Sequence, residues 1–470
     1  MADAGGAPEE ISADQADATI RSKQYVGLLI VVAVIGVLVS LAAWCFLEGI
    51  YQLQQELFTH LPHALGYQHG PPKWWYVLVL AVGSLLVALA LWRLPGSDKH
   101  IPAKGLSADP TPPINLPGIL LASFATIGFG LVLGPEVPLI ALGGGLAVLM
   151  ISLARRDTPP QALTVIAAAG TFSALSFIFT SPLIAAVILI EATGLGGPKL
   201  RVVLLPGLLA AGIGTLVSLG IGSISGLSTS AYALGPLPLS SLGRPTVAEF
   251  GWTIGLAIVV AVVTAVVMRG GMFTYRFVSR RQLLVLLPLI GLIIAGLAIG
   301  FSQATGKSIN NVLFDGQNQL PGLVTQAGAW SLGTVALLIL CKGLAYLLSL
   351  GSFRGGPTFP AMFLGAAGGV MASHLPGFPE SAGVAVGMGA AIVAVLRLPL
   401  SAVVLATLLT THAGTGAEPL IIVGVVVAYV VTLLLSRRRP DTVSVDATAP
   451  SPPPSPPPAP ELEPEPVGVS

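Results

Sequence analysis

A single carboxylate in a long apolar region is the residue best placed to do chemistry in this chain. Glu136 is the only charged residue between Asp109 and Arg155, and an ionised side chain at a bilayer centre costs at least about 2.5 kcal/mol. It stands in Gly134-Pro135-Glu136-Val137-Pro138, a run of helix breakers. A proline fits the first turn of a helix, where amides stay unpaired and the helix dipole is positive. The pattern therefore predicts a helix start that binds an anion beside a group able to take up a proton.

The same frame occurs again in the second part of the chain. Gly356-Pro357-Thr358-Phe359-Pro360 begins the same Gly-Pro-x-x-Pro-x-x-x-Leu-Gly pattern that runs from Gly134 to Gly143. A second matched pair follows in the same order, Pro182–Val187 and Pro399–Val404. Two matched pairs predict a duplication, with halves of about 25–225 and 246–436. Paired, interrupted apolar segments are typical of the binding site of a transporter.

We expect the two helix starts to converge on one anion site, with Glu136 as its gate. An ionised carboxylate can occupy the anion position itself, and a protonated one can move away and admit the ion. A simple helix cap is the alternative, but a charged cap in a membrane core is expensive. Partial charges also suit fast passage better than a full cation, since a conducted ion must be able to leave. The residues expected to bind the anion here are Gly134, Pro135, Val137, Gly356, Thr358 and Phe359.

The composition is that of a helical membrane protein. Only 9% of the residues are charged and 54% are hydrophobic, with a mean hydropathy of +0.86, whereas soluble domains carry about 25% charged residues. Continuous apolar runs near the ~20 residues of a spanning helix predict an all-α polytopic fold. Shorter runs broken by glycine and proline predict tilted or half-length helices that line a cavity or pack on other protein; they are Leu116–Leu133, Leu139–Leu153, Ala162–Thr180 and Pro182–Ile190. A spanning domain is expected over 25–439, between a mobile tail at 1–24 and a Pro-rich, disordered tail at 440–470.

Charge placement bears on topology and on partners. Basic residues flank the first and last spans, which by the positive-inside tendency puts both termini in the cytoplasm. The net charge of +1 gives no reason to expect a nucleic-acid partner. His60, His63 and His69 are interpreted as a solvated loop, and no metal or other cofactor is expected. Lys342 and Arg397 are interpreted as snorkelling or capping residues.

Taken together, these motifs resemble those of the CLC chloride channels and proton-coupled chloride exchangers. The Glu136 element is similar to the family's Gly-Arg-Glu-Gly-Pro, and Gly356–Pro360 to its Gly-x-Phe-x-Pro. The resemblance covers most of 25–439. It implies an inverted-repeat fold, a homodimer in the plasma membrane with one pore per subunit, and Glu136 as the external gating glutamate.

The chain departs from the family pattern at several positions. Pro135 and Val137 replace the arginine and glycine around the gate, and Pro357 removes one backbone donor. The family's anion-binding serine falls on Lys99 when the element is aligned on Ile101-Pro102, or on Ser97 with a two-residue insertion; Ile101 belongs to the same expected site. Glu191 fits the first of two internal glutamates, so it joins Glu136 in the expected proton pathway, but Ala192 stands at the second.

These features predict passive or weakly proton-coupled anion transport, with chloride as the default and fluoride or nitrate as alternatives. A different secondary transporter, coupling a proton or cation through Glu136 and Glu191, is the competing hypothesis. An intramembrane enzyme is disfavoured because the spans contain no Ser/His pair or paired aspartates.

Overall fold

The computed structural model describes residues 13–96, 101–105, 111–154, 158–193, 197–227, 232, 234–278 and 282–436. Within these ranges the regular secondary structure is helical. Gly134 and Gly356 pair in an isolated β-bridge that is not part of a longer strand. The helices, in chain order, are α1 (Ala13–Ile20), α2 (Lys23–Gln55), the π-helix η1 (Glu56–His60), α3 (Leu61–Ala64), α4 (Lys73–Arg93), η2 (Pro102–Lys104), η3 (Pro113–Asn115), α5 (Leu116–Gly128), α6 (Glu136–Ala154), α7 (Pro160–Phe179), α8 (Pro182–Thr193), α9 (Gly197–Ser225), α10 (Val247–Val278), α11 (Leu283–Thr305), η5 (Ile309–Asn311), α12 (Leu320–Thr325), η6 (Ala327–Ala329), α13 (Leu332–Ser352), α14 (Thr358–Ala372), α15 (Glu380–Leu396), α16 (Pro399–Leu409), η7 (Thr411–Ala413) and α17 (Ala417–Ser436).

Long and short apolar helices alternate along the chain, as the sequence predicts. In the described ranges, nine helices are long and apolar enough to cross a membrane. Five more are apolar but only 10–17 residues long, and they include α5, α8, α14, α15 and α16. The segments that become α6 and α7 were expected to be half-length, yet at 19 and 20 residues they are long enough to span. Proline and glycine mark where these helices begin but do not shorten them, because proline is tolerated in the first turn.

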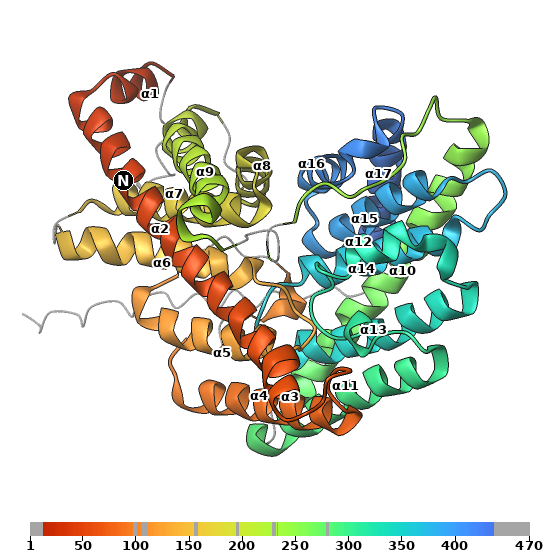
Figure 1. The fold of residues 1–470 in the computed structure, drawn as a ribbon. Coiled ribbons are helices and arrows are strands. Elements are labelled where there is room, and N and C mark those ends of the chain that lie inside the picture. The colour runs from red at the N-terminus through yellow and green to blue at the C-terminus, as the bar shows by residue number, and fades with distance from the viewer. Residues whose placement is uncertain are drawn as a thin grey trace, which may run out of the picture.

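The helices form two lobes, which Figure 1 shows side by side: α1–α9 in one and α10–α17 in the other. Helix α4 packs on α11, and α8 packs on α16, so both ends of the boundary are closed by helix contacts. Between them the chain segments before α6 and α14 approach each other. The two lobes therefore meet where the repeated Gly-Pro frames lie.

The first lobe begins with a helix where a mobile tail was expected. Residues Ala13–Ile20 form α1, which packs on α9. Ala16 is buried, and Asp17 lies 3.5 Å from Arg201 of α9. An alanine-rich segment has high helix propensity, and the contact with α9 supplies the tertiary packing that so short a helix needs.

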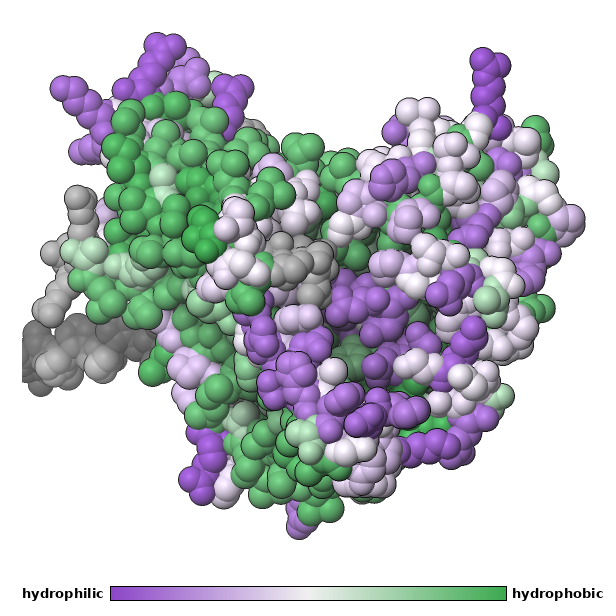
Figure 2. Space-filling view, in the orientation of Figure 1, coloured by the Kyte–Doolittle hydropathy of each residue, from purple (hydrophilic) through white to green (hydrophobic). Residues whose placement is uncertain are grey.

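The surface is apolar over wide areas. Figure 2 shows hydrophobic residues spread over the region of α2 and α9, with hydrophilic residues gathered near α12. Large side chains on α2, α9, α10 and α17 are exposed, among them Ile30, Leu216, Val259 and Val426. Exposed apolar helix faces of this extent are expected of a protein whose solvent is lipid.

Candidate functional site

The two Gly-Pro frames meet in the structure, as their repetition predicts. The Gly134 amide donates to the Gly356 carbonyl at 2.8 Å, and the Gly356 amide donates back to Gly134 at 2.6 Å. This pair of bonds is an antiparallel bridge between segments more than 200 residues apart. Directly after it, α6 begins at Glu136 and α14 begins at Thr358. Two helix starts, one from each lobe, are thus tied together by their own backbones.

The Glu136 side chain lies at the start of the opposite helix and also interacts with the first amide of its own helix. Its Oε1 accepts a hydrogen bond from the Thr358 amide at 2.5 Å. The side chain is 1% exposed, and Oε2 has no hydrogen-bond partner among the described residues. An ionised carboxylate on a free helix-start amide is a favourable, charge-assisted arrangement. The carboxylate therefore occupies an anion-binding position built by α14.

Two glycines make room for this carboxylate. A Cβ added at Gly356 would lie 1.9 Å from Cδ of Glu136, and one added at Gly134 would lie 2.2 Å from its Oε2. Neither glycine has a positive φ, so the backbone conformation does not require glycine here. Glycine is required because the Glu136 side chain fills the space that a Cβ would take.

Aromatic and apolar side chains close the site. The Phe359 ring stacks on Phe179 of α7, with ring centroids 5.8 Å apart. Phe359 also covers Gly134, where an added Cβ would come within 2.8 Å of its Cδ2. Pro135 and Val137, the residues on either side of Glu136, are buried. Burial of this kind excludes water and strengthens the interaction between the carboxylate and the amide.

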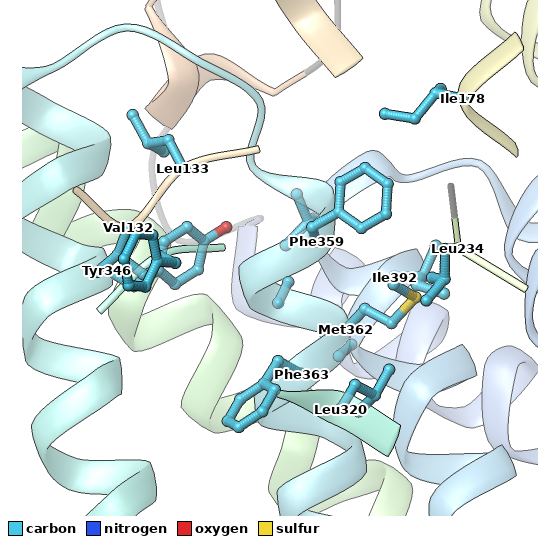
Figure 3. Packing of buried hydrophobic residues seen from close by; sticks show 14 of the residues in the cluster. Val132, Leu133, Ile178, Leu234, Leu320, Tyr346, Phe359, Met362, Phe363 and Ile392 are labelled. Atoms are coloured by element: carbon cyan, nitrogen blue, oxygen red, sulfur yellow. The ribbon is translucent and has the colours of Figure 1, made fainter. Parts of the chain in front are cut away.

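Tyr346 of α13 belongs to the same group, although sequence reasoning did not single it out. Its hydroxyl donates to the Pro357 carbonyl at 2.6 Å, and the side chain is fully buried. Pro357 and Thr358 share one peptide group, so the bonds run from the Tyr346 hydroxyl through that peptide to Glu136. Figure 3 shows the Tyr346 hydroxyl pointing towards the part of α14 that carries Phe359. The signal available in the sequence was a lone tyrosine in the apolar run before the second frame.

Only Ile101 of the third expected anion-binding element lies among the described residues. Ser97 and Lys99 lie outside the described residues. Ile101 is buried and immediately precedes η2, which packs on α10 and α13. The described residues thus supply two of the three expected elements.

Glu191 lies apart from Glu136, at the contact between α8 and α16. Its Oε1 accepts from the Leu400 amide at 2.9 Å, and its Oε2 accepts from the amide and hydroxyl of Ser401 at 2.7 and 2.6 Å. Both carboxylate oxygens therefore cap the first turn of α16. Glu191 of α8 thus binds the start of α16, just as Glu136 of α6 binds the start of α14. In both cases a carboxylate of one lobe binds a helix start of the other.

Of the two interpretations given for Lys342, the structure supports capping and not snorkelling. It is 0% exposed, and its Nζ donates to the carbonyls of four consecutive residues, Asn311 to Phe314, at 3.0–3.3 Å. A lysine buried in a protein is stable only when its charge is well satisfied. The four carbonyls provide that, so the capping part of the interpretation is correct.

A family model described as voltage gated chloride channel matches residues 102–433, more than half of the chain. Among curated proteins, the putative ion-transport protein YfeO of Escherichia coli O1:K1 is 28% identical over 368 residues, covering 77% of this chain and 82% of that one. YfeO of Shigella boydii serotype 4 matches with the same identity and coverage.

Three solved structures share the fold. A slow cyanobacterial Cl⁻/H⁺ antiporter is 20% identical with a TM-score of 0.70, covering 87% of this chain and 95% of that one. A CLC-type fluoride/proton antiporter is 19% identical with a TM-score of 0.66, covering 90% and 97%. A eukaryotic CLC transporter is 18% identical with a TM-score of 0.65, covering 87% and 72%. All three confirm an all-helical, multi-pass membrane fold for this chain.

Proposed function

Because this chain belongs to the voltage gated chloride channel family and is an anion transporter of the CLC type, we propose that its anion binds at the start of α14 and that Glu136 is the gate. The observation that carries the proposal is the hydrogen bond from the Thr358 amide to the Glu136 carboxylate. A carboxylate on that amide marks where a permeating anion would bind, since both need the same donor and the same positive helix end.

The gate works by exchanging one negative group for another. Ionised Glu136 holds the Thr358 amide through a charge-assisted bond and fills the space above Gly356. Protonation removes the charge, and a neutral acceptor holds the amide less strongly. The side chain then leaves and an anion takes its place. The helix start binds this anion through partial charges only, so the anion can leave again.

Chloride is the default anion in this proposal, with fluoride and nitrate as alternatives. The solved relatives include a Cl⁻/H⁺ antiporter and a fluoride/proton antiporter, so both ions occur within the fold. We propose passive or weakly proton-coupled transport, because the family resemblance places Ala192 at the position of the second internal glutamate. For Glu191 to carry protons, it would have to release its bonds to α16. A homodimer in the plasma membrane, with both termini cytoplasmic, completes the proposal.

The decisive test uses Glu136→Gln in protein reconstituted into liposomes. Glutamine has the size of glutamate and the neutrality of its protonated form. We expect anion flux to persist while its dependence on pH is lost. Glu418→Gln is the matched control, because Glu418 is an exposed carboxylate in the first turn of α17, and it should retain the wild-type profile. A Glu136→Gln variant with an unchanged pH profile would refute the gate.

Ion selectivity and coupling need a separate measurement. Flux of chloride, fluoride and nitrate is followed in turn, with the proton gradient either clamped or left free. Passive flux under the clamp supports a channel, and anion-driven uphill proton movement supports an exchanger. If none of the three anions moves, the proposed function is wrong.

A further inference from the structure

A second carboxylate is held close to the gate by the turn between η5 and α12. Lys342 binds four successive carbonyls of this turn, from Asn311 to Phe314. Its Nζ also lies 4.5 Å from the centre of the Phe363 ring, on α14. Four carbonyls on one buried ammonium fix the path of the backbone, because releasing any of them would leave a buried acceptor unpaired.

The turn ends in a strained residue that leads directly to the carboxylate. Phe314 has a φ of 60°, in the left-handed region that bulky residues rarely adopt. Its amide donates to the Gly130 carbonyl at 2.9 Å, and its ring meets Phe58 edge-on at 5.1 Å. These contacts and the Lys342 clamp hold the conformation in place. Strain retained in this way is common at functional sites, and the next residue is Asp315.

Asp315 lines a cavity that extends to Pro135, the residue before Glu136. The cavity has a volume of about 40 Å³ and is lined by Asp315, Gln317, Tyr51 and Tyr232 on its polar side. Pro135, the residue before Glu136, also lines it. One water needs roughly 10–15 Å³ on this measure, so the cavity has room for water. Gln317 is 6% exposed, and its Nε2 is buried without a hydrogen-bond partner among the described residues.

The charged and titratable groups around Asp315 come from several elements. Lys342 on α13 and Glu136 on α6 both interact with it electrostatically. Tyr51 on α2 and Tyr232, before α10, share the cavity, and Glu48 of α2 acts on Tyr232. Burial raises the pKa of the Asp315 carboxyl, while the Gln317 amide and the charge of Lys342 lower it by less. A raised pKa brings a carboxyl closer to the range in which it can exchange protons near neutrality.

We propose that Asp315 relays protons to Glu136 through water in this cavity. Protonated Asp315 gives its proton to a water, that water gives a proton to the Glu136 carboxylate, and Asp315 is reprotonated from the solution. No other bond is made or broken. The proposal rests on Glu136 being the gate, and it adds a residue between that gate and the bulk solution. Glu136 is 1% exposed, so its carboxylate has little direct contact with bulk water and needs another group to deliver the proton.

The competing role for Asp315 is that of a counter-charge for Lys342. Asp315→Asn separates the two roles. Asparagine keeps an oxygen to accept the Gln317 amide, which Asp315 Oδ1 accepts at 3.0 Å, but it cannot release a proton. After a rapid drop in pH, the rise in anion flux should be about 100-fold slower than in the wild type. The final flux at low pH should match the wild type, and Asp315→Glu should restore the rate.

The rise in anion flux after the drop in pH is also measured with Asp315→Asn in the Glu136→Gln background. There Asp315→Asn should have no effect, because no gate remains to be protonated. If Asp315→Asn lowers flux equally at every pH and in both backgrounds, Asp315 is a counter-charge and the relay is refuted. If Asp315→Asn does not fold, Gln317→Leu removes a polar group from the cavity lining instead. It should slow the rise too, and an unchanged rate would refute the relay. Failure of the gate itself is recognised separately, because Glu136→Gln alone would then keep its pH profile.

Discussion

Replacing Gly356 by alanine would place a methyl carbon where the Glu136 carboxylate now lies. The added Cβ would be 1.9 Å from Cδ of Glu136 and 2.1 and 2.3 Å from its two carboxylate oxygens. These are the three nearest atoms, so the closest contacts are all with the gate. The φ of Gly356 is not positive, so alanine fits the backbone. The Glu136 side chain must therefore leave its position at the start of α14.

The free energy that Glu136 loses on leaving the start of α14 determines how much the anion flux rises. Glu136 forfeits its bond to the Thr358 amide, and a hydrogen bond to a charged group contributes about 1.5–3 kcal/mol. At 1.36 kcal/mol per factor of ten, the ratio of open to closed gates rises roughly 10- to 150-fold. Anion flux at alkaline pH should then approach the flux seen at acid pH. The pH dependence should flatten in the way expected of Glu136→Gln.

Liposome flux measured between acid and alkaline pH tests this prediction. Gly343→Ala is the matched control, since an added Cβ at Gly343 in α13 meets nothing within 4 Å. The control should behave as the wild type. In the Glu136→Ala background the three closest contacts of the added methyl group disappear, so the double variant should match Glu136→Ala alone. A folded Gly356→Ala protein with wild-type pH dependence would show that Glu136 does not close the pathway from this position.

Two further predictions concern hydrogen bonds that act on helix starts. Tyr346→Phe removes the hydroxyl that donates to the Pro357 carbonyl. Losing a net bond of about 1 kcal/mol should raise anion flux at alkaline pH up to about fivefold. An unchanged flux would show that this bond does not influence the gate. Glu191→Ala removes the three bonds that cap α16 and should lower stability by about 0.5–2 kcal/mol, seen as a lower thermal unfolding midpoint in detergent. Glu191→Gln keeps an oxygen acceptor and should lose less, whereas equal losses in the two variants would contradict the capping role.

Much of the architecture follows from the sequence because it depends on local chemistry. The low charge content and the long apolar runs require a lipid-embedded, helical chain. Proline and glycine fix where the interrupted helices start, since these residues act on their own backbone. The repeated Gly-Pro frame and the lone charge of Glu136 identified the candidate site, and the family resemblance is confirmed. All of these signals can be read from composition and from sequence patterns, without knowing which residues meet in space.

The partners of each polar side chain were decided only by the tertiary structure. The Thr358 amide is 222 residues from Glu136 along the chain, and the Ser401 amide is 210 residues from Glu191. Sequence periodicity describes one helix at a time and cannot say which helix start a carboxylate will reach. For the same reason the sequence left open whether Lys342 snorkels or caps, and the structure shows it bound to the carbonyls of the turn before Asp315. A buried polar group must find a partner, but packing of the two lobes determines which partner is within reach.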